Sequence, residues 1–166
     1  MTAEAWLLGI LLVQGALGAF DTLYNHEYVE RLRARPVARP EVALHAAREA
    51  IYAALFIGLA WFDWHGAAAW VIGVLLAGEI LIVAVDEAVE NRIRVLPQNE
   101  RVLHAFLILN LGLLTAVLAP VLSHWSAQPS GLVFQSHGLA SMVLTAFGLA
   151  SGFWSALDAV AARRLG

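Results

Sequence analysis

Acidic side chains end a long apolar segment in the stretch Gly78-Glu79-Ile80-Leu81-Ile82-Val83-Ala84-Val85-Asp86-Glu87-Ala88-Val89-Glu90. The apolar segment runs from Ala67 to Val85, which is long enough for a helix to cross a bilayer. Glu79, Asp86 and Glu90 follow one another at seven and four residues, so a helix carries them on one face. An ionised carboxylate in hydrocarbon is unstable unless a partner, a proton or a metal ion compensates its charge. The partner of Glu79 is therefore central to the function.

The whole chain is apolar, since 60% of its 166 residues are hydrophobic. A soluble domain of this size has far less apolar surface to bury. Five segments are apolar over most of their length, and the second becomes long enough to span a bilayer if it begins near His45. They are Trp6–Phe20, Ala50–Trp61, Ala67–Val85, Val102–Leu122 and His137–Leu157. The sequence predicts an all-α polytopic membrane protein with five transmembrane helices and a lipid bilayer as its surroundings.

Cysteine is absent, which excludes disulfides, thiolate metal sites and covalent c-type haem. The net charge of −3 gives no reason to expect a nucleic-acid partner. The N-terminus lacks a basic segment before its first apolar stretch. We therefore expect that stretch to be a spanning helix and not a cleaved signal.

All basic residues are arginines, and they lie in residues 31–48, 92–101 and 163–164. The connections 62–66 and 123–136 contain none. Basic residues collect on the cytoplasmic side of membrane proteins. The distribution predicts a multi-pass protein of the inner (cytoplasmic) membrane, with its N-terminus outside and its C-terminus in the cytoplasm.

Polar residues recur with matching spacings in the two halves of the chain. Gln14, Asp21, Asn25, Glu41 and His45 correspond in order to Glu79, Asp86, Glu90, Glu100 and His104. The match predicts a duplicated helical hairpin within a single integral membrane domain, 1–166. The hairpins 1–64 and 65–122 are expected to form a four-helix bundle, with a peripheral fifth helix in 137–166.

At a rise of about 1.5 Å per residue, polar residues from the four bundle helices reach matching heights near the cytoplasmic face. The candidate metal ligands are Asp21, His45, Glu49, Glu79, Asp86 and His104. Carboxylates and imidazoles of this kind hold di-iron and di-manganese sites in four-helix bundles, and zinc is also suited. Those sites use Glu-x-x-His, whereas this chain has Glu-x-x-x-His. We predict a dinuclear site for two divalent ions, with iron as the first choice.

A site inside the bilayer suits a hydrophobic small-molecule substrate such as a quinol, an acyl chain or an isoprenoid. The expected reaction is an oxygen-dependent oxidation, which would make the protein a metal-dependent oxidoreductase. Glu79 and Asp86 are its candidate catalytic residues. A membrane-protein partner and a homo-oligomer both stay open.

Part of the third apolar segment is similar to the catalytic helix of the small bacterial diacylglycerol kinases. The matching residues are Glu79-Ile80-Leu81, Ala84, Asp86, Val89 and Arg92-Ile93. The resemblance implies a lipid phosphotransferase in which Glu79 is the base and Asp86 helps to hold magnesium–ATP. It covers only residues 79–93. The asparagine that this family has between its carboxylates is Ile82 here, and the chain has no lysine to hold phosphates.

Two further functions, from different classes of protein, also fit the polar residues. A proton or ion pathway would use Glu49 and Glu79 as titrating sites, and a haem-binding accessory subunit would hold haem b through His45 and His104. A protonated Glu79 would hydrogen-bond Gln14 or Asn110 instead of a metal.

The remaining polar residues have simpler expected roles. Arg48 is expected to pair with Asp158, because Arg48 points about 100° away from Glu49 on a helix. Glu41 and Glu100 are expected to be helix-start carboxylates in solvent, although a role as metal ligands stays open. His26 is expected to face the lipid headgroups.

Overall fold

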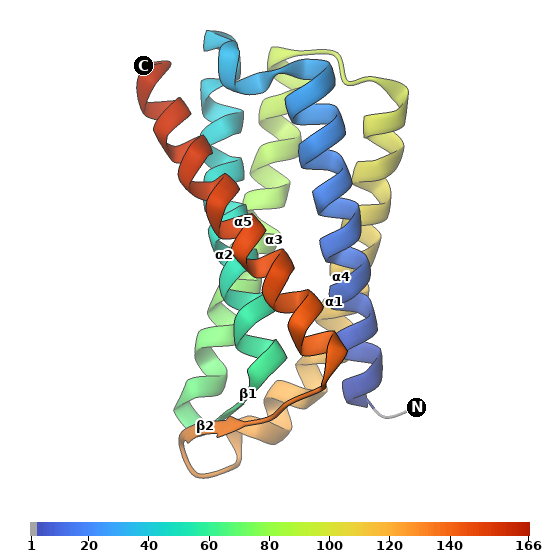
Figure 1. Cartoon of the computed structure of the whole chain (residues 1–166), viewed down its shortest axis with the longest axis vertical. Coiled ribbons are helices and arrows are strands. Elements are labelled where there is room, and N and C mark those ends of the chain that lie inside the picture. The colour runs from blue at the N-terminus through green and yellow to red at the C-terminus, as the bar shows by residue number, and fades with distance from the viewer. Residues whose placement is uncertain (1–2) are drawn as a thin grey trace.

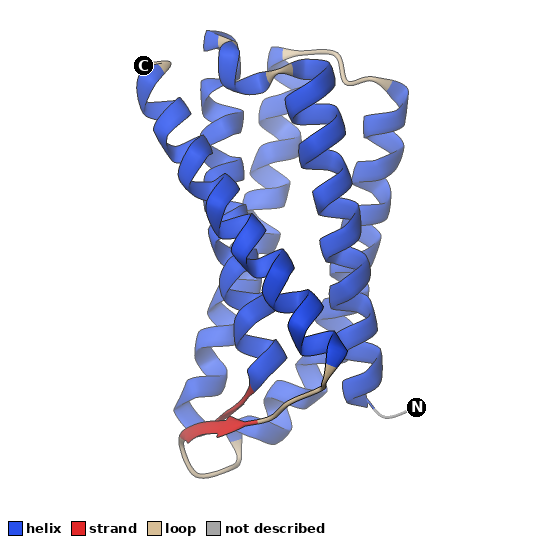
Figure 2. Cartoon of the chain, in the orientation of Figure 1, coloured by secondary structure: helices blue, strands red, loops and turns tan. Residues whose placement is uncertain are grey.

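The computed structural model describes residues 3–166 and is almost entirely helical (Figures 1 and 2). The long helices are α1 (Ala3–Phe20), α2 (Arg39–Trp61), α3 (Ala69–Ile93), α4 (Gln98–Ser126) and α5 (Leu139–Arg164). The short ones are η1 (Asp21–Glu30), η2 (Leu32–Ala34), η3 (Pro36–Ala38) and η4 (Gly66–Ala68). Each long helix, with α1 continued into η1, is long and apolar enough to cross a membrane. The predictions of an all-α fold and of five helices of spanning length are thus confirmed.

At the charged end of the molecule, prolines and a residue with left-handed backbone conformation mark the ends of the helices. Arg31 has φ of 50°, a left-handed conformation that stops η1. Pro40 lies in the first turn of α2, where a helix needs no backbone N–H donor. Pro97 directly precedes α4.

The long helices enclose an interior, and α5 closes the gap between α1 and α2. Contacts join α1 to α4, α4 to α3, α3 to α2, α2 to α5, and α5 back to α1. In Figure 1, α5 (red) runs obliquely across the face between α2 and α1. The fifth helix thus covers one side of the bundle interior, beyond the peripheral role expected for it.

Small residues let α5 approach α2 closely. A Cβ atom at Gly148 would lie 2.6 Å from Cγ1 of Ile57, so only glycine fits at this crossing. Nearby, the Ser155 hydroxyl donates to the carbonyl of Ala46 at 2.7 Å. The close packing fixes α5 against the helix that carries His45 and Arg48.

One half of the interior is a purely apolar core. Every long helix contributes a completely buried side chain to it: Leu11, Leu55, Ile72, Leu114 and Leu144. Dense packing of this kind holds the helices in a single arrangement. The polar side chains in the other half are therefore presented by fixed helices.

A small antiparallel ribbon joins two connections at the apolar end of the molecule. Strands β1 (Phe62–His65) and β2 (Gly131–Phe134) pair with Phe62 opposite Phe134. The strands lie within the connections 62–66 and 123–136, and each is only four residues long.

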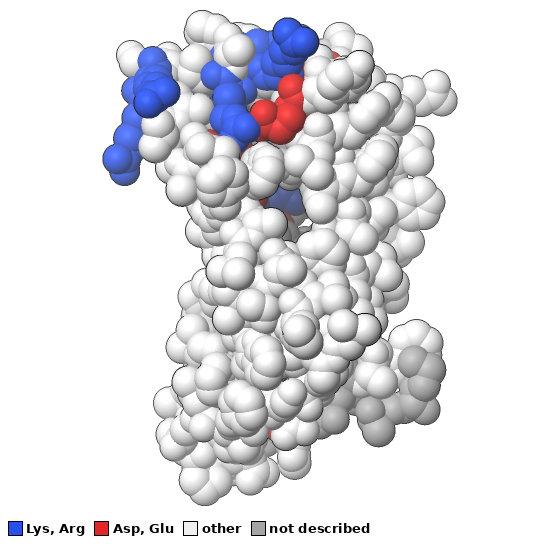
Figure 3. Space-filling view, in the orientation of Figure 1, with Lys and Arg blue, Asp and Glu red and all other residues white. Residues whose placement is uncertain are grey.

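Charged residues gather at the opposite end. The face in Figure 3 carries arginine and acidic side chains near the C-terminal end of α5, and most of the remaining surface is uncharged. The polar half of the interior lies at this charged end, as the positions of the arginines in the sequence led us to expect.

Candidate metal centre

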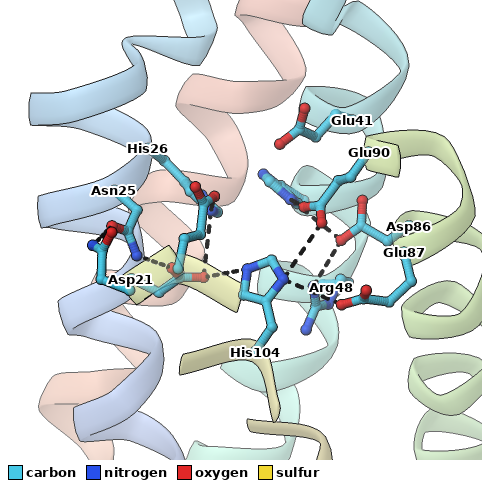
Figure 4. Close-up of polar contacts among 12 residues, drawn as sticks. Asp21, Asn25, His26, Glu41, Arg48, Asp86, Glu87, Glu90 and His104 are labelled. Atoms are coloured by element: carbon cyan, nitrogen blue, oxygen red, sulfur yellow. Dashed lines mark hydrogen bonds and ion pairs between the residues drawn. The ribbon is translucent and has the colours of Figure 1, made fainter. Parts of the chain in front are cut away.

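Polar side chains from four segments, all but one of them ionisable, converge inside the charged half of the bundle (Figure 4). They are Asp21, Asn25 and His26 of η1, Glu41, His45 and Arg48 of α2, Asp86, Glu87 and Glu90 of α3, and Glu100 and His104 of α4. Glu41, Glu90 and Glu100 have no exposed surface at all. Burying so many charges is unfavourable unless each group has a partner.

The first cluster consists of Asp21, His26, Glu100 and His104, whose potential ligand atoms lie within 4.8 Å of one another. Asp21 Oδ2 is 3.3 Å from Nε2 of His26 and 3.3 Å from Nε2 of His104. His26 Nε2 lies 3.8 Å from Glu100 Oε1. Asn25 donates to the other oxygen of Asp21 at 2.7 Å, which fixes the orientation of the carboxylate.

The second cluster consists of Glu41, His45 and Glu90, again with ligand atoms within 4.8 Å of one another. His45 Nε2 lies 3.3 Å from Asp86 Oδ2 and 3.8 Å from Glu90 Oε1. The other oxygen of Glu90, Oε2, lies 3.4 Å from Nδ1 of His104. Glu90 therefore connects the two clusters.

A π-helix explains how His26 reaches the first cluster. Segment η1 is a π-helix, in which hydrogen bonds run from residue i to i+5. This winding brings Asp21 and His26, five residues apart, onto the same side. On an α-helix the same spacing would separate them widely. From the sequence, His26 was expected to face the headgroups. Its side chain is only 11% exposed and points inward.

Glu79 is paired with Arg48, for which the sequence suggested another partner. Arg48 Nε donates to Glu79 Oε1 at 3.1 Å, and Nη1 donates to Asp86 Oδ2 at 2.8 Å. The expected pairing of Arg48 with Asp158 is therefore wrong, and Asp158 instead lies 3.4 Å from Nη1 of Arg33. The long arginine side chain reaches around its helix, so the direction of its Cα–Cβ bond did not decide its partner.

Arg94, in the connection between α3 and α4, clamps two buried carboxylates. Its Nη2 donates to Glu41 Oε1 at 2.7 Å and to Glu100 Oε1 at 2.6 Å. Burial alone lowers the pKa of Arg94, but hydrogen bonds to Glu100 and Glu41 outweigh burial and raise the pKa above its ordinary value. Glu41 and Glu100 are thus fully buried helix-start residues, not the solvated ones that the sequence favoured.

A separate hydrogen-bonded layer lies next to the apolar core. Asn110 donates to Gln14 at 2.7 Å, and Gln14 donates to the Tyr52 hydroxyl at 2.8 Å. Gln14 and Asn110 thus bond each other, while Glu79 accepts a hydrogen bond from Arg48.

Four of the six predicted ligands lie in or beside the two clusters: Asp21, His45, Asp86 and His104. Glu79 lies outside both clusters and accepts a hydrogen bond from Arg48, which also donates to Asp86. Glu49 falls outside the groups found among the described residues and lines a neighbouring cavity. The additional cluster members are His26, Glu41, Glu90 and Glu100, and Glu87 joins Glu90 and His104 in a third group. The i, i+4 spacing of Asp86 to Glu90, Glu41 to His45 and Glu100 to His104 was the signal for three of them.

Several buried polar atoms have no hydrogen-bond partner within the described part of the chain. They are His26 Nε2, His45 Nε2, both carboxylate oxygens of Glu90, Asp86 Oδ1, Glu79 Oε2, Glu49 Oε2 and Trp154 Nε1. Four of these eight atoms belong to members of the two clusters, on His26, His45 and Glu90. Buried polar groups are nearly always satisfied in proteins, and these clusters could hold a metal ion.

No protein-family model, curated protein or solved structure matches this chain. The function is accordingly inferred from the geometry of the centre itself.

Proposed function

We propose that the chain is a membrane-embedded metalloprotein with a carboxylate/histidine dinuclear site in the charged half of the bundle. The proposed protein is an oxidoreductase for a lipid-soluble substrate. The observation that carries the proposal is the close approach of ligand atoms on His26, His45 and Glu90 that make no hydrogen bond within the described residues.

The charge balance supports two divalent ions. Six buried carboxylates surround the centre: Asp21, Glu41, Glu79, Asp86, Glu90 and Glu100. Arg48 and Arg94 compensate two of these charges. With neutral imidazoles, four negative charges are left, which equals the charge of two divalent cations. Buried charges need such compensation.

The spacing of the ligand atoms also supports the proposal. Ligands bonded to one ion at about 2.1 Å lie about 3 to 3.5 Å from each other. Asp21 Oδ2 and His104 Nε2 are 3.3 Å apart, and so are Asp86 Oδ2 and His45 Nε2. One ion would be held by Asp21, His26 and His104, and the other by His45, Asp86 and Glu90.

Arg94 would position the remaining carboxylates. A carboxylate has about four lone-pair positions, so hydrogen bonds from Arg94 leave room on Glu41 and Glu100 for a metal. Second partners of this kind hold metal ligands in place.

The ligand chemistry favours iron, with manganese or zinc as alternatives. Carboxylates and imidazoles suit these ions, and the chain has no cysteine to select a softer metal. A bound iron pair would supply oxygen activation. This chain's own residues would hold the ions, exclude water and orient the substrate.

Elemental analysis of the purified protein tests the proposal. We expect about two transition-metal ions per chain in the wild type and a large loss in a His45→Ala/His104→Ala variant. His124→Ala is the matched control, because His124 is exposed at the far end of α4. Absence of stoichiometric metal from the wild type, when purified without chelator and after loading with ferrous ion, would refute the proposal.

A lipid phosphotransferase would need Glu79 as a free base, but Arg48 donates a hydrogen bond to this carboxylate. Phosphoryl transfer from magnesium–ATP that is lost in Glu79→Gln would favour that function. A Soret band would favour haem, and ion flux in liposomes without bound metal would favour a conduction pathway.

A further inference from the structure

A cavity of about 130 Å³ opens between α1, α2 and α5, beside the candidate metal centre. Figure 3 shows the face of the molecule hollowed at this height, with basic and acidic atoms at the bottom of the hollow. The cavity borders the apolar core, and its volume is close to that of cavities that hold one benzene ring.

The lining combines apolar and polar side chains. Gly15, Phe56 and Phe147 form part of the apolar wall. Asp21 and His45, both proposed ligands of the metal centre, line the same cavity. A ligand in the cavity would therefore reach the proposed ions.

Two polar groups outside the metal clusters line this cavity without a hydrogen-bond partner among the residues described. They are the indole Nε1 of Trp154 and the carboxylate Oε2 of Glu49, both shielded from solvent. Indole Nε1 can only donate a hydrogen bond, and a carboxylate accepts one. A hydroxyl group can satisfy both, because it accepts through its oxygen and donates through its hydrogen.

We infer that this cavity binds the hydroxylated ring of a lipid-soluble phenol or hydroquinone, with Trp154 donating to the ring oxygen and Glu49 accepting from the hydroxyl. The apolar wall contacts the ring, and the open side lets a hydrocarbon tail extend into lipid. The role of this ring as a substrate rests on the proposed function, whereas its binding does not require a metal.

Binding to the metal-free wild type in detergent tests the recognition of the hydroxyl. The probes are 4-decylphenol and decylbenzene, which share the ring and tail and differ only in the hydroxyl group. We expect 4-decylphenol to bind at least about tenfold more tightly, since two buried hydrogen bonds are at stake. Equal affinities for the two probes would overturn the inference.

Variants then test the two hydrogen-bonding groups. Trp154→Phe and Glu49→Gln should each weaken binding of 4-decylphenol by about five- to tenfold and leave decylbenzene unchanged. If both variants bind 4-decylphenol as the wild type does, these groups do not recognise the hydroxyl.

Two leucine substitutions on α1 test the location. Gly18 lines the cavity, and a Cβ atom there would meet no atom within 4 Å, so Gly18→Leu should fill the space and abolish binding. Gly9→Leu is the matched control, because Gly9 lies on the same helix with equally open surroundings and outside the cavity lining. The melting temperatures of both variants show whether they fold as the wild type does. Wild-type affinity for 4-decylphenol in a folded Gly18→Leu variant would overturn the inference.

The outcomes separate this inference from the proposed function. Selective binding of 4-decylphenol by a chain that takes up no metal would support the cavity and refute the metal centre. If the chain binds stoichiometric metal but binds both probes equally, the metal centre is supported and the cavity inference is refuted.

Discussion

Glu90 and His45 face each other across the interior of the bundle, with Glu90 Oε1 3.8 Å from His45 Nε2. Neither atom has a hydrogen-bond partner within residues 3–166. The separation is too long for a hydrogen bond. If the distance between these two atoms became shorter by less than about 1 Å, it would suit two ligands of one ion. The second oxygen of Glu90 lies 3.4 Å from Nδ1 of His104, so Glu90 contacts a histidine of each cluster.

The first prediction concerns Glu90 as a ligand of the proposed site. Glu90→Gln removes one charge and one metal-binding oxygen, so we expect metal content to fall from about two ions per chain to one or fewer. Elemental analysis measures the ratio. Glu30→Gln is the control, because Glu30 pairs with Arg35 away from the centre. Equal metal content in both variants would contradict a role for Glu90 as a ligand.

Metal removal should lower stability. An ion that binds only the folded chain stabilises it by about 2.7 kcal/mol when the free ion concentration is one hundred times the Kd. Chelation should therefore lower the melting temperature in detergent, as followed by circular dichroism, and re-addition of ferrous or manganous ion should restore it. The His45→Ala/His104→Ala variant should not respond. A wild-type melting temperature that is insensitive to chelator would count against a bound metal.

Loss of Arg48 should destabilise the fold strongly. Arg48→Met leaves Glu79 and Asp86 without their shared cation, and an unpaired buried charge costs about 3–5 kcal/mol. Adding Glu79→Gln should recover part of this loss, and the difference gives the coupling energy in a double-mutant cycle. Arg35→Met, at an exposed ion pair, should cost less than about 1 kcal/mol in the same unfolding assay. Similar losses for both arginines would argue against a buried pair.

Arg94 should tune metal affinity through the carboxylates that it holds. Arg94→Lys keeps the positive charge but loses the planar guanidinium that reaches Glu41 and Glu100 together. We expect metal affinity to fall about ten- to hundredfold. Arg92→Lys, two residues away on the exposed surface, serves as the control in the same competition titration. Unchanged affinity in Arg94→Lys would show that this arginine does not position ligands.

The turn after β1 requires a glycine. Gly66 has φ of 59°, and a Cβ atom there would lie 2.5 Å from Cα of Ser130. Gly66→Ala should thus destabilise the fold by about 1–3 kcal/mol. Gly73→Ala, in open surroundings within α3, should instead be neutral or stabilising by up to about 1 kcal/mol. Equal stability of the two variants would contradict the contact between the two connections at this end.

The cluster members differ in how far the sequence alone could place them. His45 and Asp86 were predicted to meet because each belongs to the polar face of its helix. The 3.3 Å distance between His45 Nε2 and Asp86 Oδ2 agrees with that pattern. His26 was not predicted, since the π-helical winding of η1 leaves no clear signal in residue spacing. Glu49 was grouped with His45 by helical spacing; it lies outside the groups found among the described residues and lines the same cavity as His45. The duplicated hairpin and the membrane sidedness stay predictions.

The sequence by itself determined that five long helices form and that acidic and imidazole groups from four of them lie towards the same end of the bundle. Apolar length and helical periodicity are local properties, so they can be identified without a fold. Only the tertiary structure decided which charges meet. The ion pairs of Arg48 and Arg94 depend on the rotation of packed helices and on long side chains that reach across them. The closure of the cavity by α5 depends on the contact at Gly148, which no local pattern specifies.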